Sequence, residues 1–315
     1  MHLEARLRAF SAFARRRSFS AAADELRISQ PAVSKHIADL ERVFGLQLVE
    51  RARRDGALTS AGEFLANYVL RAESLLAQSA RGMDELCRGG AGSLVIVASW
   101  LTGTYLLPEI IAEFKYRHPG VRVSLELGTA RQAVEWLRSH RAELGFVAGA
   151  VTGPEIDAEP LLDNEISIVG KPSLLPKRMT RDSLESLPWI SREEGSATRG
   201  SSDAGMARIG IAPRTRLELP SYEAVVWALK KGYGISAISR YVVAEQIRTG
   251  TLVVFPVRGW KVKNVVSVLR VRDAILTPTA ERFQSLVRAK FADTARLRKQ
   301  NPRDPRRASA PTSRP

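Results

Sequence analysis

Residues 30–40 combine hydrogen-bonding side chains with a helical repeat of apolar residues. Val33, Ile37 and Leu40 recur at helical spacing, which predicts a helix with one buried face. The opposite face exposes the hydrogen-bonding set and its small neighbours, namely Gln30, Pro31, Ser34, Lys35 and Ala38. Amide, hydroxyl and ammonium groups near the start of a helix can form hydrogen bonds with base edges in the major groove of DNA. The alternative is an ordinary solvated helix face.

A second helix precedes this one, and a basic hairpin follows it. Ser18 or Ser20 can cap a helix before a short turn at residues 27–29, so the two helices have the spacing of a helix-turn-helix. The dipeptide Asp55-Gly56 between two apolar stretches is a hairpin signal. We call this hairpin the wing. Its tip would present three cations suited to phosphates or to the minor groove: Arg51, Arg53 and Arg54.

Two loops farther along the chain are rich in hydroxyl groups and could bind an anion. The polar candidates in these loops and at the end of a third segment are Ser99, Thr102, Thr104, Thr129, Ser196, Thr198 and Arg199. Loop N–H groups and hydroxyls stabilise negative charge, and the guanidinium of Arg199 can add a positive charge. Trp100 and Phe146 can supply apolar walls. The alternative for each hydroxyl, taken singly, is a helix cap.

Alternating strands and helices position these loops. The first half follows a series of strand, helix, strand, helix and strand at 94–98, 105–117, 121–127, 130–138 and 144–148. This order predicts a parallel sheet that binds ligands at the carboxyl ends of its strands. A similar second lobe is indicated by strands at 165–169, 189–191 and 234–238 and by a helix at 221–231. A strand at 265–269 returns to the first lobe, and a helix at 277–290 closes it.

Residues 59–89 predict one long amphipathic helix. Either Thr59 or Ser60 can cap its start, and the glycine-rich segment 89–92 ends it and supplies a hinge. The apolar stripe of such a helix needs a partner. The residues expected in an interface with a second copy of the chain are Leu65, Tyr68, Ala72, Leu75, Leu76 and Met83. The alternative is that the stripe packs on its own domain.

The composition favours a nucleic-acid partner. The chain has 315 residues and a formal net charge of +15, from 48 Lys plus Arg against 33 Asp plus Glu. A protein with this excess of positive charge is biased toward binding polyanions. The alternative is that a basic tail alone raises the net charge. Residues 293–315 predict a disordered tail of this kind. The single cysteine, Cys87, suits a reducing compartment. With no signal-peptide pattern and no apolar run that spans a bilayer, we expect a cytoplasmic, nucleoid-associated protein without a membrane partner.

Enzyme chemistry finds little support in the sequence. The four histidines, which show no metal-ligand spacing, are His2, His36, His118 and His140. No P-loop occurs. Residues 232–237 fit G-x-G-x-x-A, but they follow a helical pattern and lack an acidic residue about twenty positions later. We therefore expect a protein that is not an enzyme, with no catalytic residue, no metal site and no cofactor.

Motifs throughout residues 3–292 resemble the LysR-type family of transcription regulators. The N-terminal motifs are Phe19-Ser20-Ala21-Ala22-Ala23, Ser29-Gln30-Pro31-Ala32-Val33-Ser34-Lys35 and Leu58-Thr59-Ser60-Ala61-Gly62. The later motifs include Tyr105-Leu106-Leu107-Pro108, His118-Pro119-Gly120-Val121 and Gly232-Tyr233-Gly234-Ile235. The resemblance implies a winged helix-turn-helix, a long helix that pairs antiparallel with its twin, and an effector domain like a type II periplasmic-binding protein. It also implies base reading by the polar residues at 30–35 and backbone contacts by the arginines of the wing.

These features together predict an α/β protein in four parts. The parts are a winged helix-turn-helix at 1–58, a linker helix at 59–89, a two-lobed effector domain at 90–292 and a basic disordered tail at 293–315. Lobe I is expected at about 93–162 and 265–292, and lobe II at about 163–264.

The expected function is that of a sequence-specific DNA-binding regulator whose promoter binding is changed by a small-molecule effector between the two lobes. Its expected partners are double-stranded operator DNA, the effector, further copies of itself as a homodimer or a dimer of dimers, and RNA polymerase. Leu101 stands where the family often has a polar residue, and Trp100 is bulky. Both favour a carboxylate with an apolar body over a small inorganic anion. The alternatives are an architectural DNA-binding protein that senses nothing and an enzyme on the same fold.

Overall fold

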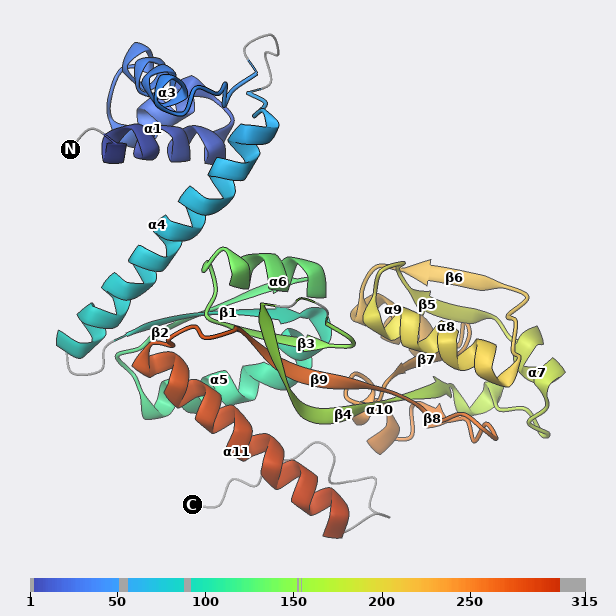
Figure 1. Ribbon diagram of the computed structural model, residues 1–315. Helices are drawn as coiled ribbons and strands as arrows, with labels where there is room; N and C mark the ends of the chain where they lie inside the picture. The colour runs from blue at the N-terminus through green and yellow to red at the C-terminus, as the bar shows by residue number, and fades with distance from the viewer. Residues whose placement is uncertain (1–2, 51–55, 88–91, 152, 154, 301–315) are drawn as a thin grey trace. The chain divides into compact units, whose positions relative to one another are not determined.

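The computed structural model describes residues 3–50, 56–87, 92–151, 153 and 155–300, with side chains described only between residues 4 and 292 of these ranges (Figure 1). The chain divides into two compact units, and the boundary lies between Ala80 and Arg81. Unit 1 contains the N-terminal helices and most of a long helix, and unit 2 contains the α/β part.

Unit 1 begins with a helix-turn-helix. Its helices are α1 (Leu3–Arg16), α2 (Phe19–Leu26), α3 (Gln30–Phe44) and the N-terminal turns of α4 (Ser60–Cys87). The Ser18 hydroxyl accepts a hydrogen bond from the Ala21 N–H at 3.3 Å, so Ser18 and not Ser20 caps α2. The apolar positions of the predicted helices form a single buried core, which includes Phe10, Phe13, Val33, Ile37 and Leu40. The buried face predicted for the third helix is therefore confirmed.

The predicted hairpin follows α3 as a short wing. Val49 and Leu58 form an antiparallel bridge, and the Glu50 N–H donates to the Ala57 carbonyl at 3.0 Å. The three arginines expected at its tip, Arg51, Arg53 and Arg54, lie outside the described residues. After the wing, the Thr59 hydroxyl accepts the Gly62 N–H at 3.0 Å, so Thr59 is the residue that caps α4.

The predicted alternation of strands and helices forms the parallel part of a mixed sheet in unit 2. The strand order is β2-β1-β3-β9-β4-β7, with β8 paired to β4. The parallel strands are β1 (Ser93–Ser99), β2 (Arg122–Gly128) and β3 (Leu144–Ala148). The antiparallel strands are β4 (Ile156–Gly170), β7 (Ser236–Ser239), β8 (Val253–Val254) and β9 (Val262–Val271). The expected parallel sheet of lobe I is thus extended by antiparallel strands.

Helices cover both faces of the sheet in lobe I (Figure 1). α6 (Ala130–Arg138) shares a core cluster with Val97, and α5 (Leu107–Arg117) and α11 (Pro278–Gln300) share another with Ile96. Neighbouring residues of β1 therefore serve opposite faces, as the alternation of a strand requires. A π-helical turn, η1 (Thr102–Leu106), precedes α5 and places the helical start before the expected residue 105.

Lobe II contains a second, two-stranded sheet in addition to β7 and β8 of the first sheet. β5 (Trp189–Arg192) and β6 (Arg216–Leu219) pair in parallel. The sequence did not predict β6, because it is short and carries exposed charges in place of an apolar run. The helices of this lobe are α7 (Arg181–Ser186), α8 (Ala197–Ile209), α9 (Tyr222–Lys231), α10 (Ala244–Arg248) and the 3-10 turn η2 (Pro172–Leu174).

Two long strands connect the lobes. β4 and β9 pair from Ile156 opposite Val271 to Ile166 opposite Val262, so both are longer than predicted. Two residues before the lobe II end of this ladder, the Asn164 side-chain amide donates to the Asn264 amide oxygen at 2.8 Å, and both residues are buried. A polar pair in an apolar interior is tolerated when its hydrogen bonds are made, so these amides fix one register where the strands cross between lobes.

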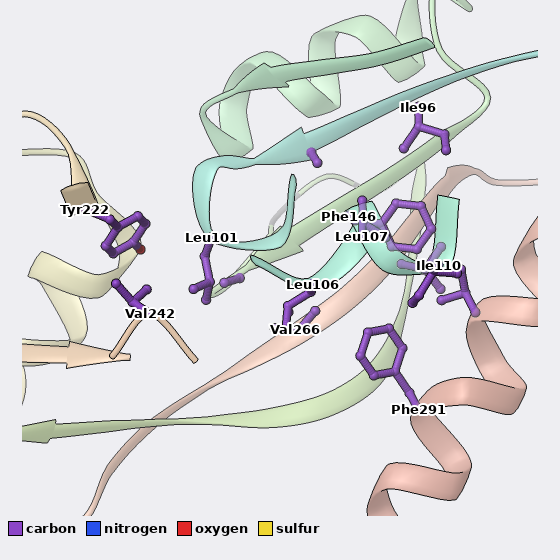
Figure 2. Packing of buried hydrophobic residues seen from close by; sticks show 14 of the residues in the cluster. Ile96, Leu101, Leu106, Leu107, Ile110, Phe146, Tyr222, Val242, Val266 and Phe291 are labelled. Carbon is purple, nitrogen blue, oxygen red and sulfur yellow. The ribbon is translucent and has the colours of Figure 1, made fainter. Parts of the chain in front are cut away.

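One hydrophobic core extends from lobe I into lobe II. Figure 2 shows Leu101 and Leu106 of lobe I with Tyr222 and Val242 of lobe II, all members of this core cluster. Leu101 is only 2% exposed. Complete burial of a leucine side chain contributes about 1.5–3 kcal/mol, so apolar contact at this point holds the two lobes together.

Candidate DNA-binding and effector-binding sites

The outer face of α3 presents the predicted base-reading residues to solvent. Gln30, Pro31 and Lys35 are exposed, and Ser34 and Ala38 are half-buried. The Ser20 hydroxyl lies 3.2 Å from the Gln30 amide oxygen and donates to it, which orients the Gln30 amide. The Ser29 hydroxyl caps α3 by accepting the Ala32 N–H at 3.4 Å. The start of the helix therefore carries donors and acceptors in a fixed arrangement.

A hollow of about 380 Å³ lies beside this face. Its walls come from the end of α1, the start of α2, the predicted base-reading side of α3 and both strands of the wing. The lining residues are Arg17, Ser18, Phe19, Ser20, Gln30, Ser34, Ile37, Val49, Glu50 and Gly56. The described part of the wing therefore borders the same surface as the predicted base-reading residues of α3, as the predicted winged helix-turn-helix requires.

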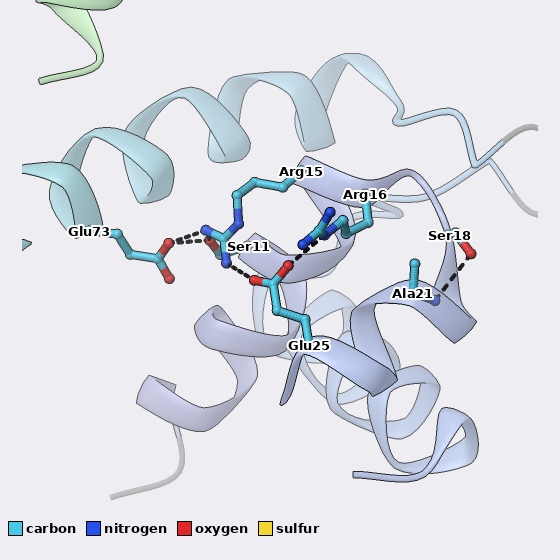
Figure 3. A network of polar contacts seen from close by, with 7 residues as sticks. All are labelled: Ser11, Arg15, Arg16, Ser18, Ala21, Glu25 and Glu73. Carbon is cyan, nitrogen blue, oxygen red and sulfur yellow. Dashed lines mark hydrogen bonds and ion pairs between the residues drawn. The ribbon is translucent and has the colours of Figure 1, made fainter. Parts of the chain in front are cut away.

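A charged network braces the helices of unit 1 (Figure 3). The Arg15 guanidinium donates to the Glu73 carboxylate of α4 at 2.5 Å and to the Glu25 carboxylate of α2 at 2.6 Å. Glu73 also accepts the Ser11 hydroxyl at 2.5 Å, and Glu25 accepts from Arg16 at 2.7 Å. The hydrogen bond from Arg15, supported by the one from Arg16, lowers the pKa of Glu25 below its ordinary value. The network joins α4 to the helices that position α3.

Large apolar side chains are exposed along α4. Of the six residues expected in a dimer interface, Tyr68, Ala72, Leu75, Leu76 and Met83 are exposed. Leu65 is instead half-buried against the core of unit 1, so its part in the interface stays a prediction. Phe64, which the sequence prediction did not include, is 68% exposed, and its ring lies 4.9 Å from that of Tyr68. A helical spacing of four residues, counted back from Tyr68, leads to Phe64 and would have identified this residue.

Two hydroxyl groups of the first hydroxyl-rich loop, in lobe I, already make hydrogen bonds within the protein. Thr102 is fully buried, and its hydroxyl donates to the Phe146 carbonyl at 2.6 Å. The Ser99 hydroxyl lies 3.1 Å from the Thr102 hydroxyl and accepts the Ala148 N–H at 3.2 Å. Both residues therefore tie the end of β1 to β3. Only Thr104 and Trp100 of this loop are exposed.

Two further lobe I residues have structural roles. Thr129 is exposed and forms a capping box at the start of α6, since its hydroxyl accepts the Gln132 N–H at 3.2 Å. Phe146 is 1% exposed and packs edge-on against Phe283 with ring centroids 6.0 Å apart. A side chain enclosed in the core cannot form the wall of an open site, so the place predicted for Phe146 in the effector site is corrected.

The second loop, in lobe II, is also held by internal contacts. Ser196 lies at the N-cap of α8 but makes no capping hydrogen bond with its side chain. Thr198 is 2% exposed, and its hydroxyl lies 2.8 Å from that of Tyr222. The positive charge expected from Arg199 is already offset, because its guanidinium pairs with Asp203 at 2.5 Å and Glu218 at 3.1 Å.

Arg192 is a residue at this surface that the sequence prediction missed. It ends β5, and 5% of it is exposed. Its Nε and Nη2 donate to the Glu193 carboxylate at 2.6 Å each, and its guanidinium lies 4.0 Å over the Tyr222 ring. The remaining Nη1 is buried and has no hydrogen-bond partner among the described residues. The signal that could have found Arg192 is its place at the end of a strand, directly before the hydroxyl-rich loop.

The two lobes also meet through Tyr105. Its hydroxyl donates to the Glu223 carboxylate of α9 at 3.0 Å, and its ring lies edge-on to Tyr222 with centroids 5.7 Å apart. Burial, with the nearby Glu223 carboxylate, raises the pKa of Tyr105. Together with Leu101, these contacts close the space between the lobes at this point.

The described residues show neither a metal cluster nor a membrane-spanning helix. Within the described ranges, no group of three or more histidine, cysteine, aspartate or glutamate side chains could hold a metal ion. The same part of the chain contains no helix whose length and hydropathy would let it cross a membrane.

Two family models match the chain, one for each functional part. Residues 5–63 match the helix-turn-helix of "Bacterial regulatory helix-turn-helix protein, lysR family". Residues 88–292 match the "LysR substrate binding domain". The first match contains α3 and the wing, and the second contains both lobes.

Known relatives extend over most of the chain. It is 31% identical over 301 residues to the RuBisCO operon transcriptional regulator of Allochromatium vinosum, covering 93% of this chain and 98% of that one. It is 32% identical over 255 residues to the HTH-type transcriptional regulator YeiE of Escherichia coli K12, covering 80% and 86%. Among solved structures, full-length CbnR with its target DNA matches with a TM-score of 0.65 and 23% identity, over 92% of this chain and 99% of that one. The chain therefore belongs to the LysR family of bacterial transcription regulators and combines a DNA-binding helix-turn-helix with an effector-binding domain.

Proposed function

We propose that this regulator reads its operator as a homodimer through α3 and the wing, and that a small carboxylate between the lobes changes how the dimer binds. The observation that carries the DNA-reading part is the outward-facing set beside the wing, in which Gln30 and Lys35 are exposed and Ser34 is half-buried. Base-edge hydrogen bonds give sequence specificity, and the excess of positive charge adds attraction to phosphates.

The proposed dimer interface is the apolar surface of α4. Phe64, Tyr68, Leu75 and Leu76 expose large apolar side chains along one helix of unit 1. Exposed apolar patches of this kind mark protein–protein contacts, and a two-fold dimer presents two copies of α3 to the two half-sites of an operator. A dimer of dimers and a contact with RNA polymerase are extensions of the same proposal.

The proposed effector site centres on Arg192. Its guanidinium is fixed by Glu193 and Tyr222, and Nη1 is the donor left for an anion. Ser99, Trp100, Thr104 and Ser196 lie on the two hydroxyl-rich loops, whereas Arg199 is neutralised by its own carboxylates. Because Leu101 and Tyr222 fill the space between the lobes, an effector must separate them, and an apolar body would replace their contacts.

Paired arginine variants test this assignment. The promoter that the full-length chain binds is first selected from genomic DNA and fused to a reporter. R192M should abolish the change in reporter output between growth conditions and leave promoter binding intact, whereas R199M should keep the response. A normal response in R192M would remove Arg192 from the site.

A second candidate, a DNA-binding protein that senses nothing, is favoured by one observation. Leu101, Tyr222 and Val242 form a continuous apolar contact between the lobes, and such packing resists opening. The same reporter decides between the two, because a chain without an effector gives constant output in every growth condition. The sensing proposal requires at least one condition that changes the output.

A further inference from the structure

The backbone of unit 1 makes an unusually close contact where α1 ends and the second strand of the wing begins. Arg17, just after α1, has φ of 52°, a left-handed conformation that is unfavourable for a residue with a side chain. Gly56 has φ of 69°, and a Cβ added there would lie 1.9 Å from the Arg17 carbonyl oxygen. Only glycine fits this approach, because any Cβ would overlap a backbone atom that has no side-chain freedom.

Arg17 is held from two sides, so its carbonyl cannot easily yield. Its N–H donates to the Phe13 carbonyl at 2.7 Å, which continues the hydrogen bonding of α1. Its guanidinium lies 2.9 Å from the Glu63 carboxylate in the first turn of α4. The wing is confined on its other strand as well, since a Cβ at Gly62 would lie 2.0 Å from the Leu48 carbonyl oxygen.

This contact lies at the border of the candidate DNA-binding surface. Arg17 and Gly56 line the same hollow as Gln30 and Ser34 of α3. Gly56 is also the first described residue after 51–55, the segment that carries the three wing arginines. The contact therefore fixes the described base of the wing, at Val49, Glu50 and Gly56, beside the face of α3.

We propose that the contact between Gly56 and the Arg17 carbonyl is a positioning contact for DNA recognition, which sets the wing at the distance from α3 that lets both engage one duplex. The inference rests on the proposed roles of α3 and the wing. In this role Gly56 need not touch a base. It acts by keeping the basic wing in register with the base-reading helix.

Two glycine-to-alanine variants separate this contact from ordinary backbone strain. Gly45 caps α3 with φ of 65°, but a Cβ there would meet no described heavy atom within 4 Å. G45A and G56A therefore impose similar left-handed strain, and only G56A adds the collision with Arg17. The probe is a duplex selected from a random-sequence library by the full-length chain, and circular dichroism checks that each variant is folded.

The readouts separate binding by the wing from binding by α3. For G56A we expect the slope of log affinity against log salt to fall by about one for each phosphate that the wing no longer reaches, with weaker hydroxyl-radical protection on the flank of each half-site. Protection of guanine N7 in the major groove should remain. G45A should keep the wild-type slope and both protection patterns. The double variant R17G/G56A should recover part of the wild-type slope, because glycine at 17 lets the carbonyl move away.

Each other outcome has a defined meaning. A folded G56A with the wild-type slope and flank protection overturns the inference, and so does an equal decrease of the slope in G45A. If G56A does not fold, the proposal requires that R17G/G56A folds and protects the flanks of the half-sites less than the wild-type chain does. A double variant that also does not fold would contradict the proposed collision. An absence of any protected half-site with the wild-type chain would instead overturn the proposed mode of DNA binding.

Discussion

The outer face of α3 and the surface between the lobes carry similar polar groups, but they differ in how many of those groups already form hydrogen bonds within the protein. On α3, Gln30 and Lys35 are exposed to solvent. Between the lobes, Thr102, Thr198 and Arg199 already have partners within the protein. A surface that meets an external polyanion keeps its donors open, whereas a surface that closes on itself makes a ligand compete with internal contacts.

The two surfaces therefore have different energetic roles. If α3 reads DNA as proposed, the exposed side chains of Gln30 and Lys35 can meet bases directly, so each base contact should contribute to the affinity. At the proposed effector site, binding would require the separation of Tyr105 from Glu223 and of Leu101 from Tyr222. An effector can shift the arrangement of lobes only by as much as it prefers the separated form.

The largest expected effect comes from the exposed stripe of α4. L75E should dissociate the dimer, because an unpaired carboxylate buried in an apolar interface costs about 3 kcal/mol or more. V43E is the matched control, since Val43 is similarly exposed but belongs to α3. Sedimentation equilibrium should show monomers for L75E and dimers for V43E. A fully dimeric L75E would remove this face of α4 from the interface.

The next effect concerns base reading. Q30A should weaken binding to the selected operator by about 1–3 kcal/mol and relax the preference at one base pair of each half-site. K35A should weaken binding by a comparable amount if its ammonium contacts a base, or uniformly and with a smaller salt slope if it contacts a phosphate. Competition binding with single-base operator variants measures both. Unchanged specificity in Q30A and K35A together would contradict the reading role of α3.

A smaller effect is expected from the contact that closes the lobes. Y105F removes one hydrogen bond between lobes and should destabilise the closed arrangement by about 0.5–1.5 kcal/mol. Tyr116 is 89% exposed, so Y116F provides a control with the same chemistry. Amide hydrogen exchange should accelerate at η1 and at the start of α9 in Y105F only. Equal exchange in both variants would mean that Tyr105 does not hold the lobes together.

The smallest effect is a dependence on pH. Since Arg15 lowers the pKa of Glu25 below its ordinary value in the folded chain, the carboxylate stabilises unit 1 at neutral pH. This stabilisation is fully present above the ordinary pKa and disappears as the pH falls through the lower value. The free energy of unfolding of E25Q should therefore fall less steeply on acidification than that of wild type. Parallel curves would show that Arg15 does not stabilise the Glu25 carboxylate.

The sequence predicted the DNA-binding part more completely than the effector site for a physical reason. The face of α3 follows from a periodicity, and Val33, Ile37 and Leu40 leave little choice about which residues face outward. Hydroxyls at strand ends carry no such information, because the same serine or threonine can cap a helix, bridge two strands or meet a ligand. Thr102 and Thr129 took structural roles for this reason.

The other features that the sequence did not predict involve contacts between distant parts of the chain. The opposing carboxylates of Arg199 include Glu218, on a strand that the sequence did not predict. The role of Arg192 depends on Tyr222, which belongs to a different helix farther along the chain. The close approach of Gly56 to Arg17 is likewise visible only after folding, since the Asp-Gly signal indicated a turn and not what the turn would touch.

The most direct test of operator reading by a dimer is a high-resolution footprint of the full-length chain on a selected duplex. We predict two patches of major-groove protection, separated by about one helical turn (~10 base pairs) or a multiple of it, each flanked by backbone protection from the wing. Q30A should lose protection at one base in each patch. A single continuous protected stretch without half-sites, unchanged by Q30A, would contradict sequence reading by a dimer through α3.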